Sequence, residues 1–367
     1  MQIERVVLRK VSLPLAKPYK VSFKTYETFE PIVMEVFGRE GEHGWGEAHI
    51  PTGSSFETQD SGWAFCEAHI PNLIGLTADD ALKYLKERFS EAPNAVSGLS
   101  ATIEVASGHP AIRIAEPFEV PLLIALSAKT QRDIDEEIEK HLSDGYKTIK
   151  IKVGWDVEDD LARVEMARKA IKGRADISLD ANRGFTQEQA CSFASRLNEE
   201  VKYFEQPCPA DAWDANAAVA AVSTVPVMLD EAITNLAAID RAATIKNVGA
   251  IKMKMKRIGG IGALHTAIEK ARGLGLGVSI GDGVGTEISC WAEACLTRFG
   301  VTGAGEMNGF SKAPTRLFST PLVVKGGSIV MTPDTKQEAD MDALEAHTHE
   351  TASFDTQSLH PDSAVAE

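Results

Sequence analysis

The sequence predicts an α/β protein built around a (β/α)₈ barrel, with an α+β domain in front of it. Two observations lead to this fold class: strand and helix patterns alternate strictly from about residue 120 onward, and acidic residues recur at the spacing of one βα unit. A chain of 367 residues is long enough for a barrel and a smaller domain. We expect residues 1–118 to form the α+β domain, residues 119–320 the barrel, and residues 321–367 a C-terminal segment that returns to the first domain and ends in an acidic tail.

The composition is that of an ordinary globular protein, with 44% hydrophobic and 25% charged residues. The formal net charge of −15 argues against a nucleic-acid surface or an anionic membrane as a partner. No stretch of about 18 apolar residues is present, and the N-terminus lacks the basic flank and cleavage site of a signal peptide. Five scattered cysteines without a Cys-x-x-Cys motif indicate reduced thiols, so we expect a cytoplasmic protein.

The first part of the chain is predicted to contain strands followed by helices. Residues 1–38 have the pattern of strands, and residues 40–44 form a turn after which the sheet resumes at Trp45. Residues 56–91 have mainly the pattern of helices. This part is therefore expected to be an α+β unit.

The region after residue 119 predicts eight strands, each but the last followed by a helix. The strands are expected at 120–126, 148–153, 176–180, 201–205, 225–230, 250–255, 278–280 and 303–307. The helices are expected at 130–141, 157–170, 187–197, 212–222, 235–243, 262–272 and 286–298. Eight units favour a closed barrel over an open sheet, and residues 322–331 indicate a hairpin that returns to the first domain.

Three acidic residues fall at the ends of successive predicted strands. Asp180, Glu205 and Asp230 are spaced 25 residues apart, and each is followed by a loop. Active sites of such barrels lie at the C-terminal ends of the strands. Three oxygen ligands there suit Mg²⁺, and the absence of histidine at these positions argues against zinc.

Lysines occupy one face of two predicted strands on either side of these acids. Lys150 and Lys152 alternate with isoleucines, and Lys252 and Lys254 alternate with Ile251 and methionines. The apolar face suits the outer helices, so the lysines should point into the barrel. Strands 2 and 6 of eight lie opposite each other, which places Lys152 and Lys254 across the mouth from one another.

This arrangement suggests proton abstraction next to a carboxylate. A metal and lysines can bind a substrate carboxylate and stabilise the enediolate that forms when the α-proton leaves. A lone acid at a strand end is more often a helix cap, and alternating lysines are usually a solvated face. Equal spacing and apolar flanking residues favour the catalytic interpretation here. We further expect Glu231 to point away from the site, and Lys256 to lie beyond the strand as a surface lysine or as an anchor for a phosphate-like group.

These motifs resemble those of the enolase superfamily, specifically the muconate lactonizing enzyme subgroup of the mandelate racemase/muconate lactonizing enzyme family. The matching motifs are Lys150-Ile151-Lys152, Leu179-Asp180-Ala181-Asn182, Tyr203-Phe204-Glu205-Gln206-Pro207, Leu229-Asp230-Glu231, Lys254 five residues before Gly259-Gly260, and Trp45-Gly46-Glu47-Ala48. The resemblance implies a modified TIM (β/α) barrel under an N-terminal capping domain that the C-terminal segment completes. It also implies Mg²⁺ on Asp180, Glu205 and Asp230, with Lys152 and Lys254 as acid/base catalysts.

Some residues depart from the family pattern. Asp282 stands near the seventh strand end, where members often carry a glutamate. Glu306 stands where dipeptide epimerases of this subgroup carry an Asp-x-Asp pair, which puts dipeptide epimerisation in doubt. With Lys150, these two residues are our candidates for substrate binding. The capping loops expected to determine specificity are residues 17–26 and 50–57.

The sequence therefore predicts a Mg²⁺-dependent isomerase that acts on a small carboxylate. We favour a racemase or epimerase of an amino acid or related carboxylic acid, because two opposed lysines fit a 1,1-proton transfer. The alternatives are a muconate-type cycloisomerase, an acid dehydratase that carries out β-elimination, and a catalytically silent barrel that only binds a ligand. We expect a homo-oligomer.

Overall fold

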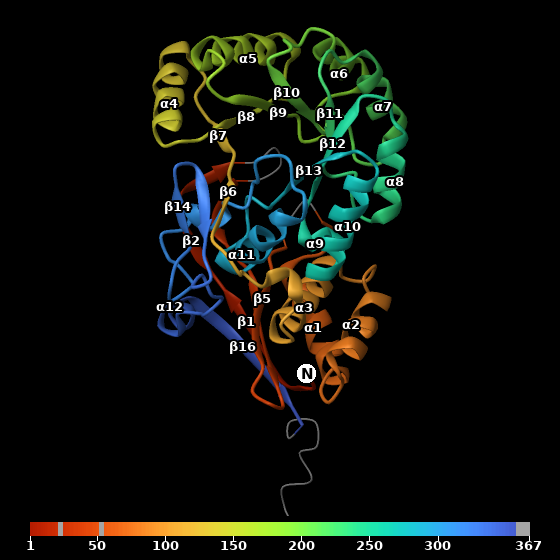
Figure 1. Ribbon diagram of the computed structural model, residues 1–367, viewed down its shortest axis with the longest axis vertical. Coiled ribbons are helices and arrows are strands. Elements are labelled where there is room, and N and C mark those ends of the chain that lie inside the picture. The colour runs from red at the N-terminus through yellow and green to blue at the C-terminus, as the bar shows by residue number, and fades with distance from the viewer. Residues whose placement is uncertain (21–24, 51–54, 357–367) are drawn as a thin grey trace, which may run out of the picture.

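The computed structural model describes residues 1–20, 25–50 and 55–356. A barrel-like α/β region and an α+β region lie against each other, and the N-terminus lies in the α+β region (Figure 1). Two buried hydrophobic clusters correspond to this arrangement. One is formed mainly by the parallel strands and their helices, and the other by the first sheet and the helices that pack on it.

The α+β region is a four-stranded antiparallel sheet with helices on one face. In spatial order its strands are β16 (Thr348–Asp355), β1 (Ile3–Val11), β4 (Ile32–Gly38) and β5 (His43–Ala48). Its helices are α1 (Gln59–His69), α2 (Ala78–Glu87) and α3 (Pro93–Ala106), with short 3-10 turns at Ile70–Asn72 and Pro110–Ile112. A strand from the far end of the chain therefore forms one edge of the first sheet.

The parallel sheet contains seven strands in sequential order, and helices cover its outer face (Figure 1). The strands are β7 (Ile124–Leu126), β8 (Thr148–Lys152), β9 (Asp176–Asp180), β10 (Val201–Glu205), β11 (Val227–Leu229), β12 (Val248–Met253) and β13 (Gly277–Ile280). The helices are α4 (Gln131–Ser143), α5 (Val157–Ile171), α6 (Gln187–Ala194), α7 (Trp213–Val222), α8 (Leu236–Thr244), α9 (Met255–Ile258), α10 (Ile261–Gly273) and α11 (Glu287–Leu296). The 3-10 turns Thr297–Phe299 and Gly309–Lys312 follow.

The eighth predicted strand, at residues 303–307, closes the barrel without forming a regular strand. On one side the Glu306 N–H donates to the Ile280 carbonyl at 2.9 Å. On the other side the Gly305 N–H donates to the Pro121 carbonyl at 2.8 Å, and Gly305 accepts from the Leu123 N–H at 2.9 Å. This segment therefore joins β13 to the start of β7, although only one isolated bridge, between Leu122 and Gly305, is regular.

The strand expected at 120–126 is divided in two. Its first part is β6 (Phe118–Pro121), which pairs antiparallel with β15 (Ser328–Met331) and is not a strand of the seven-stranded parallel sheet. Next to β15 lies β14 (Val323–Lys325), so the predicted hairpin forms. It packs beside β6 and not on the first sheet. The return to the first sheet is made further on, by α12 (Met341–His347) and β16, where composition suggested only a tail.

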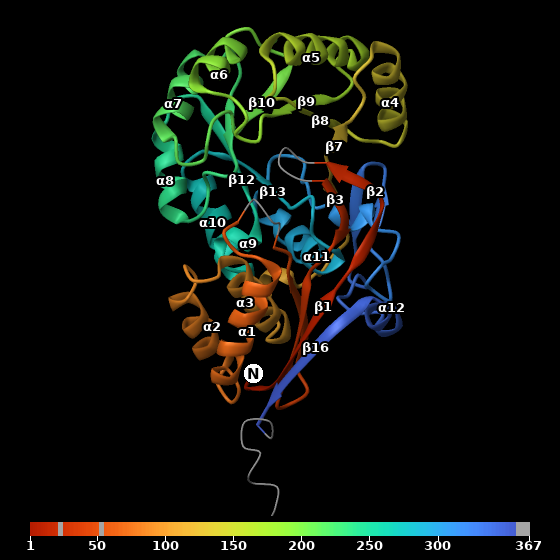
Figure 2. The ribbon, with the colours of Figure 1, turned by 180° about the vertical axis from the view of Figure 1, so that it is seen from behind.

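A separate hairpin lies between the barrel and β1 (Figure 2). It is formed by β2 (Leu13–Lys20) and β3 (Thr25–Phe29). The residues of the expected loop 17–26 that connect these strands, 21–24, lie outside the described residues, as do residues 51–54 of the loop 50–57. In the described part of the chain, no helix is long and apolar enough to cross a membrane.

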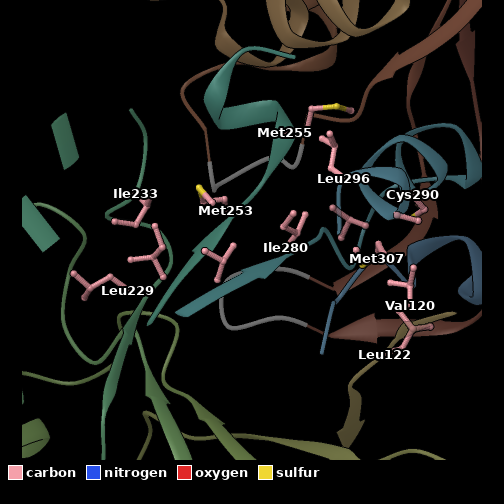
Figure 3. Close-up of a cluster of buried hydrophobic side chains, with 14 of the residues drawn as sticks. Val120, Leu122, Leu229, Ile233, Met253, Met255, Ile280, Cys290, Leu296 and Met307 are labelled. Carbon is pink, nitrogen blue, oxygen red and sulfur yellow. The ribbon is translucent and has the colours of Figure 1, made fainter. Parts of the chain in front are cut away.

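Strand parity determines which side chains enter the barrel. Ile149 and Ile151 of β8 are fully buried in the hydrophobic cluster with the outer helices, whereas Lys150 and Lys152 point inward. Figure 3 shows part of the same cluster, with Met253 of β12 and Ile280 of β13 near residues of α11. The predicted inward orientation of the lysines is therefore present in the structure.

Glu137 on α4 gives a test of the fold through its pH dependence. Its carboxylate accepts hydrogen bonds from the N–H groups of Ser127 and Ala128, at 3.0 and 2.7 Å, and from His141. Burial opposes its ionisation, but these bonds outweigh burial and lower the pKa of Glu137 to about 2. A carboxylate whose pKa is lower in the folded state stabilises the fold above its ordinary pKa, and this contribution is lost as the pH falls towards the folded-state value.

We expect Glu137→Gln to lower the thermal unfolding midpoint at pH 7, and the difference from the wild type to shrink by about half or more at pH 3. Differential scanning calorimetry at both values measures this. The matched control is Glu136→Gln on the exposed face of α4. It should change the midpoint little at either pH. An equal difference for Glu137→Gln at pH 7 and pH 3 would contradict the assignment.

Candidate active site

A cavity of about 90 Å³ lies at the C-terminal ends of the barrel strands, where β2 and β3 cover it. Two of its residues, Tyr19 and Tyr26, come from the covering hairpin. The barrel contributes Lys150, Lys152, Asp180, Asn182, Arg183, Asp230, Glu231, Lys254, Lys256, Arg257, Asp282, Gly283, Val284 and Glu306. All predicted site residues except Glu205 line this cavity.

The three predicted metal ligands lie at the ends of neighbouring parallel strands. Asp180 and Glu205 are the last residues of β9 and β10 and stand directly beside each other in register. Asp230 follows the last residue of β11. All three are almost completely buried, with at most 1% of their surface exposed. The equal sequence spacing therefore corresponds to adjacent positions at one edge of the sheet.

Two lysines lie beneath the cavity among these acids. The Lys150 Nζ is 2.8 Å from Asp180 Oδ2, 3.3 Å from Glu205 Oε2 and 2.9 Å from Glu306 Oε2. Lys252 donates to Glu205 at 3.2 Å and also bonds Glu306. Burial opposes the charge of both lysines, but the surrounding carboxylates outweigh burial and raise the pKa of each. Both lysines therefore remain charged, and neither is suited to act as a base.

The two predicted acid/base lysines line the cavity from either side of the acids. Lys152, the last residue of β8, donates to Asp180 Oδ2 and Asn182 Oδ1, both at 2.5 Å. Lys254 follows β12 and donates to Asp230 Oδ2 at 3.1 Å. Strands β9, β10 and β11 separate the two lysine positions in the sheet. Their side chains are 22% and 16% exposed, so a small molecule in the cavity could reach both.

The donor set has the chemistry that Mg²⁺ requires, since it consists of buried carboxylate oxygens. Burial, together with the charge of Asp180, raises the pKa of Glu205 to about 7, whereas Lys150 and Lys152 hold the pKa of Asp180 well below its ordinary value against burial. Among the described residues, no three His, Cys, Asp or Glu side chains gather as a group that could hold an ion. The carboxylates instead bond to lysines, so the residues fit a metal by type and the magnesium site stays a prediction.

The auxiliary residues have clear partners. Asp282 follows β13 and forms an ion pair with Lys256, while Glu306 is held by two lysines beneath the cavity. The expectation that Lys256 lies at the surface is wrong: its side chain is only 15% exposed, because the chain turns into α9 at Met255. Glu231 also lines the cavity and does not point away from it. Strand parity ends at Leu229, so it does not predict the direction of Glu231.

Several cavity residues were not singled out from the sequence. Arg257 donates to the carbonyl oxygen and to Oδ1 of Asp230, at 2.7 and 3.0 Å. Asn182 and Arg183 follow Asp180 with positive φ angles of 42° and 68°, a conformation that non-glycine residues seldom adopt. Such strain often accompanies functional sites. Position just after a strand end was the signal in the sequence that could have identified Asn182 and Arg183, whereas Arg257 lies within α9 and had no such signal.

A family model described as enolase C-terminal domain-like matches residues 133–336, more than half of the chain. The chain belongs to this family. It is 24% identical over 346 residues to the L-Ala-D/L-Glu epimerase of Bacillus subtilis (strain 168), covering 89% of this chain and 90% of that protein. It is 28% identical over 298 residues to the hydrophobic dipeptide epimerase of Citrifermentans bemidjiense, covering 75% and 80%.

The fold is shared with the muconate lactonizing enzyme of Pseudomonas fluorescens, whose crystal structure was determined with muconolactone. The TM-score is 0.85 at 21% identity, covering 95% of this chain and 99% of that chain. The predicted membership of the enolase superfamily and its muconate lactonizing enzyme subgroup is confirmed, as are the capped, modified barrel fold and the prediction of an enzyme.

Metal binding can be measured without knowing the substrate. We expect Mg²⁺ to bind the wild type and raise its thermal unfolding midpoint, because an ion that binds only the folded state stabilises it. Asp230→Asn should weaken Mg²⁺ binding by at least about 10-fold in isothermal titration calorimetry. The control Asp214→Asn, whose side chain is fully exposed, should bind as the wild type does. A wild type that takes up no Mg²⁺ would refute the site.

Proposed function

We propose that this protein is a Mg²⁺-dependent racemase or epimerase that removes and returns the proton on the carbon next to a substrate carboxylate. The observation that supports this most directly is the position of Lys152 and Lys254. Both lysines line the same cavity. The three buried carboxylates lie between them, at the ends of the strands that separate β8 from β12. Two bases on opposite faces allow a proton to leave one side of a carbon and return on the other.

In this proposal the cation is held by Asp180, Glu205 and Asp230, and the two inner lysines do not exchange protons. Bound Mg²⁺ would supply positive charge beside the substrate carboxylate. Lys150 and Lys252 are almost fully buried and remain charged beneath the cavity. They provide fixed positive charge for the enediolate that forms when the proton leaves.

The partly exposed lysines are the acid/base pair. Lys152 and Lys254 each have one carboxylate partner, whereas Lys150 has three and Lys252 has two. Lys152 and Lys254 line the cavity with partly exposed side chains, so both can approach a bound ligand, whereas the side chains of Lys150 and Lys252 are almost completely buried. In either direction of reaction, one lysine takes the proton while the other supplies one.

We further propose that residues 1–118, completed by residues 321–367, cap the barrel of residues 119–320. Tyr19 and Tyr26 from the hairpin over the mouth support this, because they line the cavity together with the barrel residues. Aromatic side chains in this position would exclude water from the enediolate. The pairing of β16 with β1 supports the contribution of the C-terminal segment.

The proposed substrate is an amino acid or a related carboxylic acid. The curated relatives named above are dipeptide epimerases. In this chain, however, the acid near the eighth strand position is Glu306, which already bonds Lys150 and Lys252. Both lysines contact its Oε2, and their two positive charges would oppose the approach of a dipeptide's ammonium group. Cycloisomerisation or β-elimination would need only one of the two lysines as acid/base, so we rank both lower.

The two-base mechanism makes a prediction for each lysine. Lys152→Ala and Lys254→Ala should each lower the racemisation rate by about 10²–10⁴-fold or more. Each variant should still exchange the α-proton of one enantiomer with solvent deuterium, because the other lysine is intact. Lys202→Ala serves as the control, since Lys202 pairs with Asp176 at the opposite end of the strands. A near-normal rate for either active-site variant would exclude that lysine as an acid/base.

A screen of carboxylic and amino acids in D₂O, followed by NMR with Mg²⁺ present, tests the reaction class. We expect deuterium to enter at the α-carbon without a new compound, because the proton returns to the same carbon. A new ring or double bond would identify cycloisomerisation or elimination instead. If no acid exchanges its α-proton for deuterium, the alternative of a barrel that binds a ligand without catalysis is favoured.

A further inference from the structure

Glu293 is a buried acid on α11 that the proposed mechanism does not use. It is 2% exposed, and among the described residues it has no lysine, arginine or histidine in ion-pair contact. Its Oε1 accepts a hydrogen bond from the Met255 N–H at 3.1 Å, and its Oε2 has no hydrogen-bond partner in the described part of the chain. Burying a carboxyl group with so few partners costs stability, so this residue needs an explanation.

The hydrogen bond from the Met255 N–H is significant because the residue before Met255 is Lys254. Met255 is the first residue of α9, and Lys254 is the N-cap residue of that helix. The first N–H groups of a helix have no acceptor within the helix, and the N-cap side chain usually provides one. The Lys254 side chain makes no such bond, because its ammonium group is a donor without an acceptor and donates to Asp230 in the cavity. Glu293 therefore supplies from α11 the acceptor that Lys254 cannot.

The surroundings of Glu293 favour a neutral carboxyl group at this position. A cavity of about 20 Å³ beside it is also lined by Glu47, His49, Lys256 and Asp282. Burial, and next the charge of Asp282, raise the pKa of Glu293 to about 8. At neutral pH the group is then mostly protonated, and its carbonyl oxygen still accepts from Met255. The cavity has room for one water molecule, and Oε2 of Glu47 also lacks a partner in the described part of the chain.

We propose that Glu293 is a positioning residue for Lys254. By holding the Met255 N–H it fixes the backbone where β12 passes into α9, and with it the direction in which the Lys254 Nζ enters the cavity. Met255 of α9 and Leu296 of α11 belong to the same hydrophobic cluster (Figure 3). This inference rests on the proposed function, in which Lys254 is one of two bases.

The two-base mechanism provides a test that separates positioning from general destabilisation. Both enantiomers of the acid that exchanges fastest in the D₂O screen are incubated with each variant, and the initial rate of α-proton exchange is measured. Lys254→Ala identifies the enantiomer whose exchange depends on Lys254. For that enantiomer, Glu293→Leu should lower the rate by about 10- to 100-fold, because a misplaced base loses its alignment with the proton. Exchange of the opposite enantiomer, which depends on Lys152, should stay within about twofold.

A conservative variant and a matched control complete the experiment. Glu293→Gln keeps an uncharged oxygen acceptor for the Met255 N–H, so it should restore most of the lost exchange. The control is Glu104→Leu. Glu104 is another buried glutamate that bonds the first N–H groups of a helix, those of Ile261 and Gly262 in α10, at 2.6 and 2.8 Å. This variant should lower the thermal unfolding midpoint without separating the two exchange rates.

The outcomes of this experiment separate a failure of the positioning role of Glu293 from a failure of the proposed two-base reaction. Equal loss of both exchange rates in Glu293→Leu, or no loss of either, would overturn the positioning role while leaving the two-base reaction intact. Failure of Glu293→Gln to restore exchange would also overturn it, since the acceptor is then not what matters. If the wild type exchanges neither enantiomer of any acid, the proposed function itself is wrong, and the role assigned to Glu293 falls with it.

Discussion

The structure depends on pairing buried charges inside the barrel. Lys150 and Lys252 are almost fully buried, and the fold can accept them only because Asp180, Glu205 and Glu306 surround them. Removing one partner of such a group leaves an uncompensated charge in a medium of low dielectric constant. The pairs also fix strand register, because a shift of one residue in β8 would place its lysines among the outer helices. The same contacts that hold the site together therefore determine how the strands align.

The sequence predicted the positions of the candidate site residues well where the backbone is regular. Parity placed Lys150 and Lys152 inside the barrel, and equal spacing placed Asp180 and Glu205 side by side, because both rules hold for residues within parallel strands. They fail one or two residues beyond a strand. Glu231 and Lys256 were misplaced because β11 ends at Leu229 and α9 begins at Met255. The residues that complete a site at strand ends lie where periodicity no longer applies.

Two segments that pair with distant parts of the chain, β16 and residues 303–307, were harder to predict for a related reason. In β16 (Thr348–Asp355) no residue is fully buried, so its sequence lacks the apolar alternation that identifies a strand. It is the edge strand of its sheet and is held by backbone hydrogen bonds to β1. Residues 303–307 likewise close the barrel through backbone bonds, with two glycines among five residues. Pairing between backbones far apart in sequence has almost no signature in the side chains.

The capping sheet is connected to Lys254, which we propose as one of the two acid/base lysines, by a short series of buried contacts. Glu47 of β5 accepts hydrogen bonds from the N–H groups of Thr286 and Ser289, at 2.8 and 3.2 Å, and so holds the start of α11. Helix α11 in turn carries Glu293, which holds the residue after Lys254. Because both carboxyl groups act on backbone N–H groups, they fix main-chain position without adding a charged partner to the lysine. The cap is then more than a cover for the substrate. It is part of the frame that holds the backbone at Lys254, so under the proposed two-base mechanism a change in the capping sheet would alter proton transfer without contacting the substrate.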